Sequence, residues 1–221
     1  MLITLSILSR PFSQFNTYNS LTAASALHNA WKFKQDPEIE ILDYIKHNIR
    51  LHSPDHLSAM IYFSGLINVK DPELWNLFEM QVTRTDSVKI MNLTSVFKTF
   101  EGFARWSNEA FEVFDMLEMN IDRRVLLENC DPSVLSQGLY ALASLNRTEN
   151  AFKKVVSKIR DNKVGLSKQE VVNILWSLAV SEWKPADIKD WLEVFNETPG
   201  EISKFSERML NWSLEKIRFN K

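Results

Sequence analysis

The sequence predicts an all-α protein whose helices stack into a right-handed α-solenoid of about five helix-turn-helix repeats, closed by a C-terminal capping helix. Three observations predict this fold: bulky side chains with few glycines, apolar stretches at nearly constant spacing, and capping residues before the expected helices. The 221 residues include 5 glycines, 7 tryptophans and 14 phenylalanines, which favours packed helices over many short strands joined by tight turns.

The repeat is visible in two sets of apolar residues. Similar apolar stretches recur at intervals of 36, 36, 42 and 36 residues, beginning at Leu21, Leu57, Leu93, Leu135 and Val171. Apolar pairs follow them at intervals of 36, 36, 41 and 36 residues: Ile39/Leu42, Trp75/Phe78, Phe111/Phe114, Phe152/Val155 and Ile188/Trp191. Both sets lengthen in the third interval, which we place near residues 122–129 as a longer connection or an added helical turn. One pair of helices cannot bury its apolar face alone, so neighbouring pairs must stack. A globular bundle with coincidental spacing is the alternative.

Capping residues divide each repeat into helix A, a short turn and helix B. An N-cap acid followed by proline precedes two B helices, at Asp36-Pro37 and Asp71-Pro72. The A helices are opened by Ser53-Pro54, by Asp131-Pro132, and by a capping box of Ser167 and Glu170. We therefore assign residues 1–20 to an N-terminal extension, 21–198 to five helical hairpins, and 199–221 to the capping helix.

Charge, cysteine content and hydropathy limit the kinds of partner and site that the protein can have. The formal net charge of -2 and the pI near 6.1 give no overall attraction to a polyanion such as RNA. Cys130 is the only cysteine, so an internal disulfide and a cysteine-based zinc site are excluded. No run of 18 apolar residues occurs, so we expect no transmembrane segment.

The first 35 residues contain no Asp or Glu but include Arg10, Lys32 and Lys34. This composition favours an organelle-targeting segment within the N-terminal extension. A secretory signal fits less well, because no Lys or Arg precedes the apolar start of the chain.

Two segments resemble a known family of helical repeats. Residues 172–179 (VNILWSLA) and, less closely, 138–143 (GLYALA) resemble the first-helix signature of octotricopeptide and FAST kinase-like repeats, and the resemblance covers about residues 21–196. It implies an organellar, mitochondrial protein that acts either on RNA or as a structural subunit of a large assembly. Base-selecting residues are not carried over, because no intact motif recurs in successive units.

The sequence offers no catalytic motif, and we expect no catalytic residue, cofactor or metal. GxxxxGK[ST], GxGxxG, GxSxG and HExxH patterns are all missing. His47, His52 and His56 are close together, but the turn at Ser53 separates them, so we expect solvated or capping histidines rather than metal ligands. Cys130 precedes Asp131, which opposes thiolate formation and favours a buried or inert thiol.

Two neighbouring B helices carry opposite charges. An acidic stripe that we interpret as a partner-binding face contains Glu109, Glu112, Asp115 and Glu118. The candidate phosphate-binding or partner-binding cations are Arg147, Lys153, Lys154, Lys158, Arg160 and Lys163. The alternative is that the two helices neutralise each other along the stack, which contributes little energy at a surface.

The tryptophans divide by position. Trp75, Trp176 and Trp191 fall in the apolar registers and are predicted to be core, whereas the predicted protein–protein anchors are Trp31, Trp106, Trp183 and Trp212. We therefore expect a non-enzymatic structural subunit or adaptor of a large mitochondrial assembly, matrix or matrix-facing, whose partners are other protein subunits. The assembly is either a respiratory or ATP synthase complex or the mitochondrial ribosome. An organellar RNA-binding protein is the alternative hypothesis.

Overall fold

The computed structural model describes residues 18–84, 87–107, 109–163, 165–183 and 185–219. In this part of the chain the regular elements are all helices and no strand occurs, so the all-α prediction is confirmed. Residues 1–17, which hold most of the expected targeting segment, lie outside the described residues. None of the helices in the described ranges is both long and apolar enough to cross a membrane.

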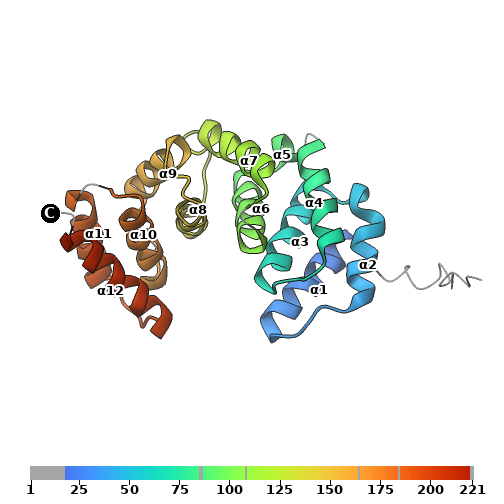
Figure 1. The fold of residues 1–221 in the computed structure, drawn as a ribbon, viewed down its shortest axis with the longest axis horizontal. Helices are drawn as coiled ribbons and strands as arrows, with labels where there is room; N and C mark the ends of the chain where they lie inside the picture. Colours follow the sequence, from blue (N-terminus) through green and yellow to red (C-terminus); the bar gives the residue numbers. More distant parts are fainter. Residues whose placement is uncertain (1–17, 85–86, 108, 164, 184, 220–221) are drawn as a thin grey trace, which may run out of the picture.

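The helices alternate between two layers of an arch, with inner helices along its concave side and outer helices along its convex side (Figure 1). The inner helices are α1 (Ser20–Phe33), α3 (Pro54–Leu66), α6 (Leu93–Trp106), α8 (Pro132–Ser144), α10 (Lys168–Val180) and α12 (Lys204–Phe219). The outer helices are α2 (Ile39–Asn48), α4 (Pro72–Arg84), α7 (Phe111–Arg124), α9 (Asn150–Asp161) and α11 (Pro185–Glu197). Two short elements that the sequence did not predict, η2 (Ile49–Leu51) and α5 (Ser87–Ile90), lie in the connections. Each inner helix packs against the next inner helix along the chain.

The predicted N-caps of the inner helices are confirmed. The Ser53 side chain accepts a hydrogen bond from the His56 amide, Asp131 accepts one from the Ser133 amide, and Ser167 forms the predicted capping box with Glu170. These caps satisfy amides that have no partner inside the first helical turn.

The predicted start of the first outer helix is wrong. Asp71 accepts a hydrogen bond from the Leu74 amide and α4 begins at Pro72, as expected. In contrast, α2 begins at Ile39, two residues after Pro37, because Glu38 has an extended backbone with ψ 138°. The Glu38 carboxylate accepts a hydrogen bond from the Tyr18 hydroxyl at 3.1 Å and makes no capping bond.

The turn from inner to outer helix has the same geometry at several points of the chain. One or two residues after the inner helix ends, the backbone adopts the left-handed conformation with φ of 54–56°. The residues in this conformation are Lys34, Asn68, Asn146 and Glu182. The following amides donate to carbonyls five residues earlier, in the bonds Gln35→Ala30, Val69→Ser64, Arg147→Leu142 and Trp183→Leu178. This Schellman-type closure satisfies the last carbonyls of the helix and reverses the chain. The turn after α6 differs, because Ser107 is extended, with φ −155°.

The N-caps correct the predicted register of the inner helices. Asn19, Ser53, Asn92, Asp131 and Ser167 follow each other at intervals of 34, 39, 39 and 36 residues. The equivalent core positions are therefore Ala23, Leu57, Val96, Leu135 and Val171, all 0% exposed. Leu21, which the apolar pattern aligned with Leu57, is 60% exposed. Apolar residues three or four apart share one helix face, so an alignment by hydrophobicity alone slips easily by that amount.

The outer register slips in the same way at two helices. Ile39 is 66% exposed and Phe111 is 64% exposed, whereas Ile41 and Val113, two residues later, face the core at 4% and 0%. The other predicted pairs are buried as expected: Trp75/Phe78, Phe152/Val155 and Ile188/Trp191. The extra residues are divided between the connection that contains α5 and the loop after α7, which lies where the longer connection was expected.

The α3 and α6 helices approach each other more closely than side chains would permit. A methyl group at Gly65 would lie 2.6 Å from the Gly102 carbonyl oxygen, and one at Gly102 would lie 2.6 Å from the Ile61 carbonyl oxygen. The Ser58 hydroxyl donates to the Ser95 carbonyl across the same junction at 2.7 Å. Only glycine at both positions permits this backbone contact.

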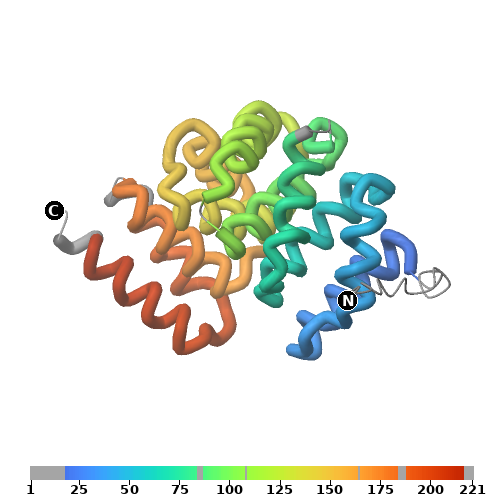
Figure 2. The backbone as a smooth tube through the Cα atoms, turned by 45° about the vertical axis from the view of Figure 1, so that its right-hand side comes forward, coloured from blue at the N-terminus to red at the C-terminus, as the bar shows by residue number. Residues whose placement is uncertain are grey.

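Both terminal inner helices present polar side chains to solvent. In α12, Ser206, Met209 and Ser213 are buried, and the helix packs on α10 (Figure 2). Its opposite side exposes Glu207, Asn211 and Glu215. Phe205 and Trp212 of the same helix are also exposed, at 65% and 43%. In α1, Ala23 and Leu27 are buried, whereas Thr22, Ser25 and Asn29 are exposed. A stack that ended in apolar faces would associate end to end, so polar outer faces stabilise it as a separate unit.

Candidate interaction surfaces

The opposite charges of α7 and α9 pair across the outer layer. The Arg147 guanidinium, at the α8–α9 connection, lies 2.6 Å from Glu118 and 2.8 Å from Asp115, and it packs over the Phe114 ring at 5.5 Å. The Lys154 ammonium lies 2.9 Å from the Asp122 carboxylate and donates to the Asp122 carbonyl oxygen at 2.8 Å. Mutual neutralisation therefore accounts for two of the candidate phosphate-binding cations.

The other predicted cations do not converge on one site. Lys153 pairs with Glu149 on its own helix at 2.9 Å, and the Lys163 ammonium lies 5.1 Å from the centre of the Trp191 ring. Arg160 is exposed, and Lys158 lines a separate cavity. A phosphate group needs several donors directed at one point. The described geometry of this segment does not provide that arrangement.

The acidic stripe of α7 is shorter than predicted. Glu109 and Glu112 are exposed, and the Asp115 side chain is 72% exposed, so these three carboxylates remain on the surface beside the exposed Phe111. The Glu118 side chain is only 21% exposed and binds Arg147, so it does not belong to the exposed face. The sequence could not show this, because the partner of Glu118 lies 29 residues away.

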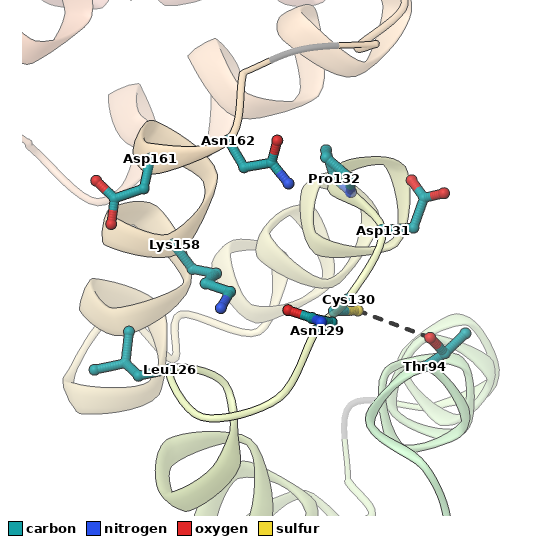
Figure 3. Close-up of a pocket in the computed structure, with 9 residues that line it drawn as sticks. All are labelled: Thr94, Leu126, Asn129, Cys130, Asp131, Pro132, Lys158, Asp161 and Asn162. Carbon is teal, nitrogen blue, oxygen red and sulfur yellow. Dashed lines mark hydrogen bonds between the residues drawn. The ribbon is translucent and has the colours of Figure 1, made fainter.

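A cavity of about 660 Å³ opens between the loop after α7 and the end of α9 (Figure 3). It is lined by Thr94, Leu126, Asn129, Cys130, Asp131, Pro132, Lys158, Asp161 and Asn162. The Lys158 side chain extends toward Asn129, while Asp131 and Asp161 lie on opposite sides of the opening. The Cys130 thiol lies 3.8 Å from the Thr94 hydroxyl, and burial raises the pKa of this thiol. One ammonium among two carboxylates and a protonated thiol makes neither an anion site nor a nucleophilic centre.

The histidines serve the local structure. The buried His52 ring is 2.8 Å from the Ser20 hydroxyl, His56 is 2.9 Å from the Ser53 hydroxyl, and His47 is 2.7 Å from the Asp43 carbonyl oxygen. Among the described residues, no three His, Cys, Asp or Glu side chains are grouped so that they could hold a metal ion. The three histidines therefore do not gather as a metal site, and His52 is buried rather than solvated.

One position of the inner helices forms a row of rings that hydrophobic periodicity did not reveal. The ninth residue after each inner N-cap is His28, Tyr62, Glu101, Tyr140, Trp176 and Trp212. Five of these six side chains are aromatic rings, and we call the set the ladder. None of the five rings is fully buried.

The ladder is continuous across the last three inner helices. The ring centroids of Tyr140 and Trp176 are 4.8 Å apart, and those of Trp176 and Trp212 are 6.3 Å apart. Helix α10 is covered by α8, α12 and α11 on three sides. The side that keeps partial exposure carries Asn173 and Trp176, so it faces the concave side of the arch.

The amide groups beside these rings are held in place. The Gln169 amide donates to the Asn173 side-chain oxygen at 3.1 Å, and the Ser206 hydroxyl donates to Gln169. The Lys216 ammonium lies 5.5 Å from the centre of the Trp212 ring. Partly exposed rings beside fixed amides are typical of surfaces that bind other molecules.

The N-terminal part of the ladder is a more compact cluster. His28 stacks on Phe63 at 4.8 Å, and Trp31 lies 5.9 Å from the same ring. Between the two aromatic parts, Arg105 donates two hydrogen bonds to the buried Glu101, at 3.0 and 2.7 Å. Partial burial, with the nearby Glu101 charge, raises the pKa of Tyr62 to about 12, so its hydroxyl stays protonated. The ion pair of Glu101 and Arg105 therefore lies between the N-terminal and the C-terminal aromatic parts of the ladder.

The seven tryptophans are thus only partly as predicted. Trp75 and Trp191 are core at 0% and 1% exposed, but Trp176 belongs to the ladder. Trp31 and Trp212 remain accessible at 44% and 43%. The other two predicted anchors pack inward, since Trp106 stacks on Trp75 at 4.9 Å and Trp183 packs on Phe152 at 5.9 Å. Counting nine residues from each N-cap would have found the ladder. Asp131, Ser167 and Ser203 are residue types that favour N-cap positions, and the Ser206 amide does donate to the Ser203 hydroxyl.

Neither the protein-family models nor the curated proteins contain a match to this sequence.

Proposed function

We propose that this protein is a non-enzymatic structural subunit or adaptor of a large mitochondrial assembly and that it acts through protein–protein contacts. The ladder is the observation that carries the proposal. Half-exposed aromatic side chains are enriched at the centres of protein interfaces, where they contribute much of the binding energy. Trp176 and Trp212, placed side by side with fixed amides, provide such a centre.

The repeat architecture supports this role. We propose that the alternating helices form a right-handed α-solenoid of five hairpins with α12 as its cap. The recurring left-handed turn residues and the polar outer sides of α1 and α12 support that assignment. Solenoids commonly bind their partners along an extended concave surface, which is the side on which the ladder lies.

RNA binding is the second candidate, and one observation favours it. Exposed rings in a row can stack with successive bases of a single strand. The electrostatic support is weaker, because Arg147 and Lys154 are paired with α7 and the net charge is -2. We therefore place a protein partner first.

Native fractionation of mitochondria tests the proposal. We expect the protein to migrate with a large complex and to be released when Trp212 is replaced by Ala. If the complex is a respiratory or ATP synthase complex, the protein should also remain there after ribonuclease treatment. Lys189→Glu, at an exposed position of α11, is the control for a surface substitution without effect. Migration only as a free monomer would contradict the proposal. Release by ribonuclease from a complex other than the ribosome would favour the RNA-binding alternative.

A further inference from the structure

The C-terminal part of the ladder presents hydrogen-bond donors that have no partner. The Tyr140 hydroxyl and the Trp176 indole nitrogen make no hydrogen bond with the described residues, yet neither atom is enclosed by protein. The Trp212 indole is also without a hydrogen bond in the described part of the chain, and this residue is 43% exposed. In the core, by contrast, the Trp75 indole donates to the Val69 carbonyl oxygen at 2.9 Å. The donors of the ladder are therefore available to a ligand.

The amide oxygens beside these rings are already occupied. The Asn173 oxygen Oδ1 accepts a hydrogen bond from the Gln169 amide, and the Gln169 oxygen Oε1 accepts one from the Ser206 hydroxyl. These two bonds leave the Asn173 nitrogen Nδ2 as a further donor without a partner among the described residues. This part of the ladder therefore has donors to offer and calls for a ligand that supplies acceptors.

The charges that the described structure places in contact with the ladder each have a partner of opposite sign. Lys216 packs over the Trp212 ring and lies 3.9 Å from the Glu182 carboxylate. Further along the ladder, Glu101 is paired with Arg105 at 2.7 Å. A phosphate-bearing strand needs several cations that are free to neutralise it, whereas an uncharged ligand needs none. Rings and donors without free charge favour a neutral ligand that is rich in carbonyl oxygens.

A proline-rich segment in the polyproline II conformation has these properties. Proline has no backbone N–H, so the segment presents carbonyl acceptors with few donors of its own. Its rings pack on aromatic side chains, and its conformation is largely fixed before binding, which reduces the entropy cost. Since the segment advances about 3.1 Å per residue, ring centroids 4.8 and 6.3 Å apart correspond to about one and a half to two of its residues.

We infer that the ladder binds a proline-rich segment of the partner protein, which lies along the concave side across α8, α10 and α12. The inference rests on the proposed function, because it specifies the chemistry of the partner at the same surface. Tyr140, Asn173 and the indoles of Trp176 and Trp212 donate to carbonyl oxygens of the segment. Its proline rings cover the exposed parts of the aromatic rings.

Selection from a displayed library of random peptides tests the inference. Peptides of about 12 residues form four turns of a polyproline II helix. The full chain is compared with Tyr140→Phe and Trp212→Phe, which keep an aromatic ring and lose one donor, and with the Lys189→Glu control. We expect the recovered peptides to be enriched in proline, to bind the control normally, and to lose about threefold or more in affinity on each donor variant. Equal thermal unfolding midpoints of the four proteins show that the fold is intact.

Replacing the prolines of a recovered peptide by alanine gives a second measurement. Alanine restores the backbone N–H and frees the conformation of the peptide. The affinity for the full chain should therefore fall about tenfold or more. A single-stranded oligouridine is titrated in parallel, because RNA also carries many acceptors. We expect it to bind more weakly than the recovered peptides at physiological salt.

Three results would overturn the inference. The first is that no recovered peptide responds to Tyr140→Phe or Trp212→Phe. The second is that the responding peptides are not enriched in proline, or keep their affinity when alanine replaces proline. The third is that oligouridine binds more tightly than any recovered peptide, and that this binding is lost both in Trp212→Ala and at high salt, which would make RNA the occupant.

The native fractionation separates this inference from the proposed function. If Trp212→Ala releases the protein from the large complex but the peptide selection fails, the proline-rich partner is wrong while the adaptor function stands. If the unmodified chain migrates alone, the adaptor function itself fails.

Discussion

The junction between α3 and α6 and the junction between α7 and α9 connect neighbouring helices by different interactions. In the inner layer, Gly65 and Gly102 bring two backbones into contact, and phenylalanines such as Phe100 and Phe103 are fully buried beside them. In the outer layer, Arg147 and Lys154 bridge to carboxylates of the preceding outer helix, and the side chains remain partly exposed.

This difference means that the inner layer determines the stability of the stack, whereas the outer layer can adjust its contacts. Close apolar packing leaves no space for another arrangement, so the inner layer fixes the shape of the arch. Partly exposed ion pairs contribute about 1 kcal/mol or less and can lengthen or exchange partners at small cost. We therefore expect most of the folding energy, and little of the adaptability, in the inner layer.

The largest expected effect comes from a cavity in the inner layer. Leu139 is 0% exposed in α8, between α6 and α10. Leu139→Ala removes buried methyl groups and leaves a cavity, so it should lower the free energy of unfolding by about 2–5 kcal/mol. Chemical denaturation measures this change. A loss below about 1 kcal/mol would mean that the inner layer can collapse around the cavity and is not as rigid as the comparison requires.

The glycine contact should be the next most sensitive point. Gly102→Ala places a methyl group 2.6 Å from the Ile61 carbonyl oxygen, which must move because it belongs to the backbone. We expect a loss of about 1–3 kcal/mol, although alanine is the better helix former. Ser157→Ala, at an exposed position of α9, is the control and should change stability by about 0.5 kcal/mol or less. Equal stabilities of the two variants would show that α3 and α6 are not in backbone contact.

The ion pairs of the outer layer should contribute less. A double-mutant cycle of Arg147→Ala and Glu118→Ala isolates the coupling between the two side chains, which are 18% and 21% exposed. We expect a coupling energy of about 1 kcal/mol, since the pair is only partly shielded from solvent. No measurable coupling would mean that this pair does not stabilise the outer layer.

The elements that the sequence predicted well are those set by neighbouring residues. Ser53, Asp131 and Ser167 cap their helices because the cap and its amide lie within three residues of each other. The buried pairs Trp75/Phe78 and Ile188/Trp191 were found for the same local reason, since one helical turn brings them to one face.

The features that the sequence did not predict depend on residues far away in the chain, or on the exact number of residues between the helix start and the core position. Leu21 was aligned with Leu57 because any apolar residue near a helix start satisfies the pattern, yet Leu21 is exposed. Trp176 was predicted to be core from its local apolar pattern. Its partial exposure depends on how Tyr140 and Trp212 pack against it, and each of these residues is 36 positions away in the sequence. Likewise, charge alone could not show that Arg147 binds Glu118.

A pH titration tests a buried polar contact where α1 meets the α2–α3 connection. Burial is the main cause that lowers the pKa of His52 from its ordinary value of 6.5. The unfolded chain therefore binds a proton more readily than the folded chain, and stability rises with pH across this window. We expect the unfolding free energy to fall as the pH drops below about 6.5 and to level off below the lowered pKa. His52→Gln should remove this pH dependence, and a persistent slope would assign it to another group.

The smallest effect is expected on the exposed face of α7. Glu112 is exposed and makes no ion pair with the described residues, so Glu112→Ala should change the unfolding free energy by about 0.5 kcal/mol or less. The comparison with Glu118→Ala, on the same helix, is informative because both remove one carboxylate and leave the helix propensity equally improved. A larger loss at Glu118 follows if the pair with Arg147 stabilises the fold. Chemical denaturation in low and in high salt compares the two positions. Added salt should reduce the cost at Glu118, where the ion pair is lost, and also the small cost at Glu112, which lies in the first turn and interacts with the helix dipole. Equal losses at both positions would mean that α7 contributes to the stack only through its apolar face, and that its charges are available for a partner.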